Sequence, residues 1–367
     1  MVDVIGSSDF NIRHLHMALD AGDAYRIARA MAIESAARST SPMDRPFGER
    51  LARESKAIAK SIRNPHAIAL SILADGLTAM MLGQFKNAWT FAEQAVAILR
   101  DQCVGVTWEL NSAQNLAVWA LLYQGEFGEL SRRLPALLAS ARSSGNWYVA
   151  TELCTRSIYV WLAADEPEEG ERVAVESIER WSHNEVHRQH YSAILTRIQI
   201  ALYRGHADGA WSLLGNLNLI LRQTYLRRVQ FTRIESCYLR ARSALAMAAE
   251  NRSSRRFRSM ARAEARRIAR ERMPWSDPIA QLVRAGIAFL EGRTPLALRY
   301  LHDAADRFER ADMRLHAAAA RRRIGALQND AAGRELQQNA EQWMATQDIK
   351  NPAGMTRMLA PGFPDLH

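Results

Sequence analysis

The strongest concentration of charge in the sequence is an arginine-rich segment, 222–272, with fifteen arginines and four glutamates. Its local charge of +11 compares with +9 for the whole chain, so the remaining residues are slightly acidic together. Five of its arginines recur every three or four residues, the spacing of one side of a helix: Arg255, Arg258, Arg262, Arg266 and Arg270. Such a ridge would bind the phosphates of a nucleic acid or the carboxylates of an acidic protein. A solvated face or an intramolecular role is commoner for such a ridge in a repeat protein, and the two binding roles are the alternatives to it.

Nucleic-acid binding has little support from base stacking, because Phe257 is the only aromatic residue within the ridge. Opposite the arginines, Ala261, Ala265 and Ile268 are spaced to pack against a neighbouring helix. The sequence therefore predicts a helix here with one basic side and one buried side.

Other residues that often do chemistry do not form a recognisable active site. His183, His187 and His190 have helical spacing, but the zinc motif H-E-x-x-H is absent, and a polar helix start explains them. The acidic stretch 165–171 has the form of a turn followed by the first turn of a helix, where carboxylates favour the helix dipole.

The three cysteines are best explained as small buried residues in a reducing compartment. Cys103, Cys154 and Cys237 lie too far apart in sequence for a metal-ligand motif, and their odd number argues against a disulfide framework. No catalytic, cofactor-binding or metal-binding residue is assigned, and we expect no cofactor. Nine tryptophans recur along the chain and fit core packing better than a ligand surface.

A turn motif recurs along the sequence at intervals of 40–45 residues after the first copy. In its clearest copy, Gly83 is followed by Phe85, Ala88, Ala92 and Ala95. Further copies centre on Gly22, Gly125, Gly205 and Gly292, with weaker ones at Asp165 and Glu250. Between the turns, apolar residues recur every three or four positions, and no convincing stretch alternates as a strand would. This pattern predicts an all-α fold, a right-handed α-solenoid of about seven helical hairpins spanning 1–347.

Three segments depart from this pattern. The first interval holds about 20 extra residues, and its segment 39–50 is predicted to be a loop. The segment 273–278 is predicted to link two hairpins, and 348–367 to form an irregular C-terminal tail.

The motif resembles the tetratricopeptide repeat, in which Gly83, Phe85, Ala88 and Ala95 match the turn glycine, the aromatic residue and two alanines of the second helix. The usual period is about 34 residues, so the hairpins would be tetratricopeptide-like with longer helices. Over essentially its whole length the chain also resembles the C-terminal helical regions of large bacterial serine/threonine protein kinases that carry an ATPase module. The segments that carry this second resemblance are "DFNIRHLHMALDAGDAYRIARAMAIES", "CVGVTWELNSAQ", "LAADEP", "RQHYSAILTRIQIALYRG" and "MLAPGF".

The motifs of kinase and ATPase chemistry are absent from the sequence: it has no HRD or DFG motif and no G-x-x-x-x-G-K-[ST] loop. The chain would then be a separately encoded arm or the tail of a truncated gene. The resemblance implies a non-catalytic scaffold, not an enzyme, that binds a protein, peptide or effector as the sensory or regulatory arm of kinase-linked signalling, with a kinase or ATPase module as a possible partner. Nucleic-acid or acidic-partner binding through 222–272 is the alternative. We expect a cytoplasmic location, since no secretory signal is visible, and no membrane attachment.

Overall fold

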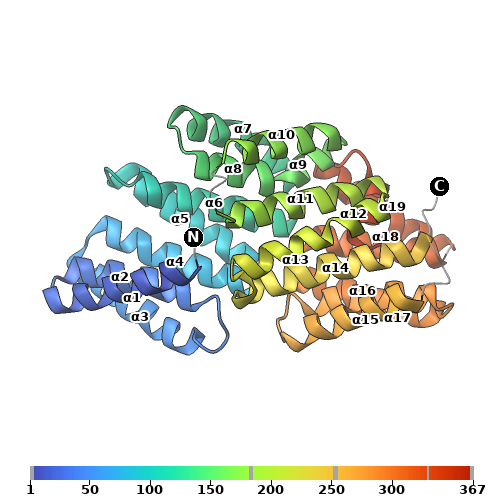
Figure 1. Cartoon of the computed structure of the whole chain (residues 1–367), viewed down its shortest axis with the longest axis horizontal. Coiled ribbons are helices and arrows are strands. Elements are labelled where there is room, and N and C mark those ends of the chain that lie inside the picture. The colour runs from blue at the N-terminus through green and yellow to red at the C-terminus, as the bar shows by residue number, and fades with distance from the viewer. Residues whose placement is uncertain (1–3, 182–184, 251–254, 329, 364–367) are drawn as a thin grey trace. The chain divides into compact units, whose positions relative to one another are not determined.

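The computed structural model describes residues 4–181, 185–250, 255–328 and 330–363, and these residues form twenty α-helices and one short 3-10 helix without any strand (Figure 1). The all-α prediction is confirmed. Consecutive helices pack in neighbouring pairs, among them α2 with α3, α4 with α5, α16 with α17 and α18 with α19.

The chain folds into two compact units. Unit 1 comprises Met1–Leu121 and Thr224–Thr232, and unit 2 comprises Leu122–Gln223 and Arg233–His367. The helices of unit 1 are α1 (Val4–Ala21), α2 (Ala24–Arg38), α3 (Arg45–Ile62), α4 (Pro65–Leu82), α5 (Phe85–Gln102), most of α6 (Thr107–Gln124) and the 3-10 helix η1 (Leu226–Arg228). Those of unit 2 are α7 (Phe127–Ser143), α8 (Trp147–Arg156), α9 (Ile158–Ala163), α10 (Pro167–Glu179), α11 (Arg188–Arg204), α12 (Ala207–Ser212), α13 (Leu214–Gln223), most of α14 (Gln230–Glu250), α15 (Arg255–Arg270), α16 (Asp277–Leu290), α17 (Thr294–Arg310), α18 (Arg314–Gln328), α19 (Ala331–Thr346) and α20 (Pro352–Leu359). A single superhelix over 1–347 stays a prediction.

Six of the seven predicted hairpin turns are confirmed. Six of the seven turn residues have positive φ and separate two helices: Gly22, Gly83, Gly125, Asp165, Gly205 and Gly292. The seventh turn was predicted near Glu250, where α14 ends; residues 251–254 after it lie outside the described residues. The small residues after Gly83 have the predicted role, since Phe85, Ala88, Ala92 and Ala95 are all fully buried in the pair α4–α5.

Two predicted irregular segments are in fact partly helical. The loop prediction for 39–50 is wrong from Arg45 onward, because α3 begins there with Pro46 in its first turn, where proline needs no N–H partner. The irregular-tail prediction for 348–367 is wrong over 352–359, which form α20 with Pro352 in its first turn. Residues 364–367 lie outside the described residues. Residues 271–276 do connect α15 to α16, but the connection is packed, with Trp275 1% exposed.

Helix α4 is long and apolar enough to cross a membrane by length and composition, and it is the one described helix of which this is true. Half of it is buried in unit 1, and its Asp75 forms an ion pair of 2.7 Å with Lys56. The core helix of a soluble protein can have the same length and composition. The prediction that the chain has no membrane attachment therefore stays a prediction.

The C-terminal segment is built into the core of unit 2. Helix α20 packs on α11 and α18, and Met355, Met358 and Leu359 are fully buried. Three side chains of other helices donate to consecutive carbonyl groups of this segment: Arg242 to Met358 at 3.1 Å, Tyr238 to Leu359 at 2.6 Å, and Arg323 to Ala360 at 3.1 Å. These bonds supply partners for carbonyls at the end of a helix, which no residue of the helix itself can reach.

We expect Tyr238→Phe to lower the free energy of unfolding by about 1–3 kcal/mol, because it leaves the buried Leu359 carbonyl without its donor. Urea unfolding followed by circular dichroism measures the loss, and hydrogen exchange of residues 352–363 should rise with it. Tyr300→Phe on α17 is the matched control, since no hydrogen bond of that hydroxyl to another described residue is found. Equal stability of the two variants would contradict the role of Tyr238.

Candidate functional site

The predicted arginine ridge lies on a helix. Helix α15 buries Ala261, Ala265 and Ile268 against α16, as expected from the sequence. On its other sides Arg255, Arg266 and Arg270 are exposed, whereas Arg258 and Arg262 are half-buried. Residues 251–254 of the arginine-rich segment 222–272 lie outside the described residues.

Only part of the ridge carries uncompensated charge. Arg262 forms an ion pair with Glu291, and Arg258 also has an interaction partner. For Arg255, Arg266 and Arg270 no ion pair is found among the described residues. The ridge is therefore a patch of three exposed arginines (Arg255, Arg266 and Arg270), which we call the α15 patch.

Elsewhere in the arginine-rich segment, charge is neutralised inside the molecule. Arg233 forms an ion pair of 2.8 Å with Glu271, and Arg240 one of 3.3 Å with Glu264. Both carboxylates belong to the segment and are already counted in its balance of +11, whereas the Arg262–Glu291 pair brings in a carboxylate from outside it. The Phe257 side chain has a packing partner inside the molecule, because its ring lies edge-on against Trp211 with 4.9 Å between the ring centroids.

The other residues singled out in the sequence have structural roles where they are described. The backbone N–H of His187 donates to His190 Nδ1 at 3.0 Å, and Trp181 donates to the His187 ring at 3.1 Å, at the start of α11. His183 lies outside the described residues. No group of three or more potential metal ligands occurs in the part of the chain that the structure describes.

The acidic stretch 165–171 is held by arginines. Glu168 and Glu171 both form ion pairs of 2.9 Å with Arg204, and Glu169 pairs with Arg172. The three cysteines are free thiols, and Cys154 and Cys237 are buried. Burial raises the pKa of the Cys237 thiol to about 12, and the Glu264 charge acts in the same direction.

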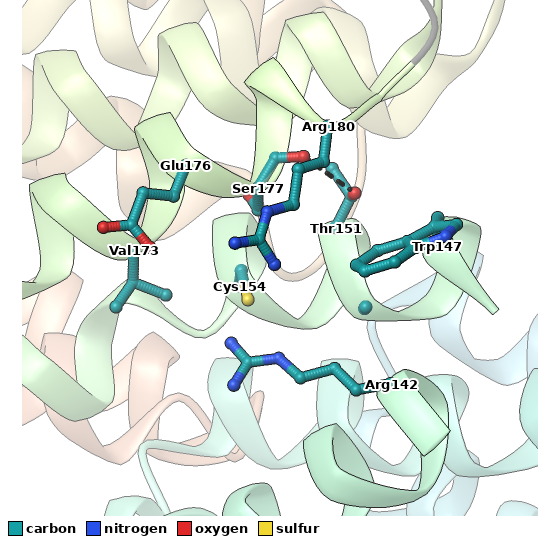
Figure 2. Close-up of a pocket in the computed structure, with 9 residues that line it drawn as sticks. Arg142, Trp147, Thr151, Cys154, Val173, Glu176, Ser177 and Arg180 are labelled. Carbon is teal, nitrogen blue, oxygen red and sulfur yellow. Dashed lines mark hydrogen bonds between the residues drawn. The ribbon is translucent and has the colours of Figure 1, made fainter. Parts of the chain in front are cut away.

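A second concentration of unpaired positive charge was not predicted. A hollow of about 310 Å³, including the solvent at its mouth, is lined by residues of α7, α8 and α10 in unit 2 (Figure 2). Arg142 comes from the last turn of α7 and Arg180 caps the C-terminus of α10. Figure 2 shows both guanidinium groups directed toward the Cys154 sulfur between them. We call this the α7–α10 hollow.

The hollow joins positive charge to an aromatic wall. The Arg180 guanidinium lies 5.8 Å from the centre of the Trp147 ring, and Trp147 is 43% exposed. The Cys154 thiol is 1% exposed, and its pKa is raised by burial, with the Arg142 charge acting in the opposite direction. Sequence spacing gave no sign of this site, because Arg142 and Arg180 belong to helices that are not adjacent along the chain.

The interior of unit 2 contains a network of buried polar groups. Glu235 on α14 accepts from the hydroxyls of Tyr123, at 3.0 Å, and Tyr191, at 2.7 Å. Burial and the Glu235 charge raise the pKa of both tyrosines far above the ordinary value, so the hydroxyls remain donors. Burial alone would lower the pKa of Arg156, but the charges of Glu235 and Glu152 outweigh it and raise that pKa.

His316 on α18 is a buried titratable group of unit 2 that lies among aromatic rings. Its ring packs against Phe308 at 5.1 Å and Tyr238 at 6.1 Å, and it is 7% exposed. Burial, followed by the nearby Arg242 charge, lowers its pKa to about 3. His316 is therefore neutral in the folded protein at neutral pH.

This burial makes stability depend on pH. Between pH 6.5 and about 3 the unfolded chain binds a proton at His316 that the folded chain does not, so stability falls as the pH drops through this window. The loss amounts to at most about 1.4 kcal/mol per pH unit. We expect His316→Gln to flatten the decline between pH 6.5 and 5, measured by urea unfolding. His302→Gln at an exposed site of α17 is the control, and parallel curves for wild type and His316→Gln would contradict the prediction.

The resemblance to the helical regions of bacterial kinases stays a prediction. Compared with models of known protein families and with curated protein sequences, the chain gives no significant match.

Proposed function

We propose that the chain is a non-catalytic helical-repeat scaffold that binds an acidic protein or peptide partner. In this proposal the paired helices belong to a right-handed, tetratricopeptide-like solenoid of about seven hairpins, which works in the cytoplasm as a regulatory arm of kinase-linked signalling. Each hairpin would bury its apolar face on its neighbours, leaving outer helix faces available for binding. The positive-φ turns and the buried small residues after them support the repeat interpretation.

The observation that carries the proposal is the α15 patch. Arg255, Arg266 and Arg270 are exposed, and no carboxylate of the described residues forms an ion pair with them. An acidic segment of a partner would supply the missing charges, and arginine binds carboxylates with two parallel hydrogen bonds.

Nucleic acid is the second candidate, because the same arginines would also bind phosphates. Two observations favour an acidic protein instead. The continuous ridge of five arginines is interrupted by the Arg262–Glu291 ion pair, and Phe257 is packed on Trp211 instead of presenting a face to a base.

The test compares two probes and two triple variants. A fluorescently labelled glutamate-rich peptide and a labelled DNA duplex are titrated with the chain across a salt series, and binding is followed by anisotropy. We expect the peptide to bind more tightly than the duplex. We expect Arg255→Gln/Arg266→Gln/Arg270→Gln to weaken peptide binding about tenfold or more, as loss of several charge-assisted bonds requires.

The control removes the same charge elsewhere. Arg132, Arg172 and Arg293 are exposed arginines that pair with nearby glutamates, and their triple glutamine variant should bind within about twofold of wild type. Equal weakening by both triple variants would show that only net charge matters and would refute the α15 patch as the site. Tighter binding of the duplex, lost in the α15 variant alone, would support nucleic acid instead.

A further inference from the structure

The α7–α10 hollow brings together two arginines that have no anionic partner. Arg142 and Arg180 form no ion pair with any described carboxylate. Glu176 also lines the hollow, but it forms an ion pair with Arg172, four residues earlier on the same helix. Arg172 is shared with Glu169, and neither of these two carboxylates forms an ion pair with Arg142 or Arg180.

Both guanidinium groups carry positive charge to the same hollow, on either side of Cys154. Both side chains are exposed, so water screens their mutual repulsion, and an anion between them would be attracted by both charges. Both residues also lie at helix C-termini, where the helix dipole favours a positive charge and holds the arginines in place. A planar or tetrahedral anion between them would accept hydrogen bonds from both.

The Trp147 ring adds an apolar surface beside the charged groups. It forms one wall of the hollow and is 43% exposed. Tryptophan side chains are on average more deeply buried than this. Arg180 lies over this ring, so the aromatic wall and the positive charge are adjacent. A ligand that combines an acid group with an apolar portion would contact both.

We propose that the α7–α10 hollow is a binding site for an acid group, a carboxylate or a phosphate, held between Arg142 and Arg180, with the apolar part of the same ligand packed against Trp147. The site is separate from the α15 patch and does not depend on the function proposed for that patch. It takes a small acidic ligand or a single acidic residue of a peptide, because the enclosed part of the hollow is small and the rest of the ligand would lie at its open mouth.

The test uses small probes of defined charge. Phenyl phosphate, phenylacetate, inorganic phosphate and the uncharged benzyl alcohol are titrated into the full chain at low ionic strength by isothermal calorimetry. We expect saturable binding of the acids and none of benzyl alcohol. Tighter binding of phenyl phosphate identifies the phosphate as the preferred acid group, and tighter binding of phenylacetate identifies the carboxylate.

Variants assign binding to the hollow. Arg142→Gln and Arg180→Gln should each weaken binding of the acids about tenfold, and Trp147→Ala should weaken the two aromatic acids but not inorganic phosphate. Arg132→Gln is the matched control, since Arg132 lies on α7 like Arg142, is exposed, and forms an ion pair with Glu129. All four side chains are exposed, so circular dichroism and unchanged thermal melting serve to confirm that the variants fold.

Two results would overturn the proposal. One is the absence of saturable binding by any acid up to ~10 mM, weaker than specific small-molecule sites usually bind. The other is binding that Arg142→Gln and Arg180→Gln leave unchanged. If the α15 triple variant reduced this binding instead, the acids would be detecting the α15 patch and not the hollow.

Discussion

The hairpins of this chain depend on one residue at the end of the first helix that adopts positive φ. At Gly83 this conformation lets two successive N–H groups return to the last turn of α4, from Gly83 to Met80 O at 3.1 Å and from Gln84 to Ala79 O at 2.9 Å. The carbonyls of the helix end are thereby satisfied and the chain reverses within two residues. Asp165 does the same with φ +56° although it carries a side chain, whose carboxylate accepts from Tyr203 at 2.6 Å. Because each helix then packs on its sequence neighbour, an apolar stripe and a small residue suffice to specify a hairpin.

Unit 2 adds a second kind of constraint, since its interior is polar as well as apolar. Burying Glu152 and Arg156 costs desolvation free energy, which is offset only because each charge has a partner: the two form an ion pair of 2.6 Å. Here burial alone would raise the pKa of Glu152, but Arg188 and Arg156 lower it. The same interior binds the carbonyls of the C-terminal segment through side chains of α14 and α18. These directional bonds fix where α20 packs, which apolar contacts alone would leave less well defined.

The sequence was sufficient to predict features that depend on nearby residues. A glycine followed by small residues at fixed offsets marks a hairpin because turn and contact both form within one helix pair, and the turns at Gly83 and Gly205 are where they were expected. Helix α20 was missed because proline and glycine at 352 and 354 resemble an irregular tail, whereas the burial of Met355 and Leu359 comes from helices far away in sequence. The α7–α10 hollow was missed for the same reason: no spacing rule joins Arg142 to Arg180.

Which arginines can act on a partner is decided by the carboxylates within reach of each, and a sequence does not show that. On α15, helical spacing placed five arginines along one ridge, yet Arg262 is bound to Glu291 and three exposed arginines without an ion pair to a described residue remain. In the hollow, Glu176 and Glu169 share Arg172, and neither forms an ion pair with Arg142 or Arg180, which lie on either side of a buried thiol. The α15 patch is open to water, so salt screens its attraction for a partner strongly. The hollow has an aromatic wall beside its charges, so a ligand there would be selected by the shape of its apolar part as well as by its charge.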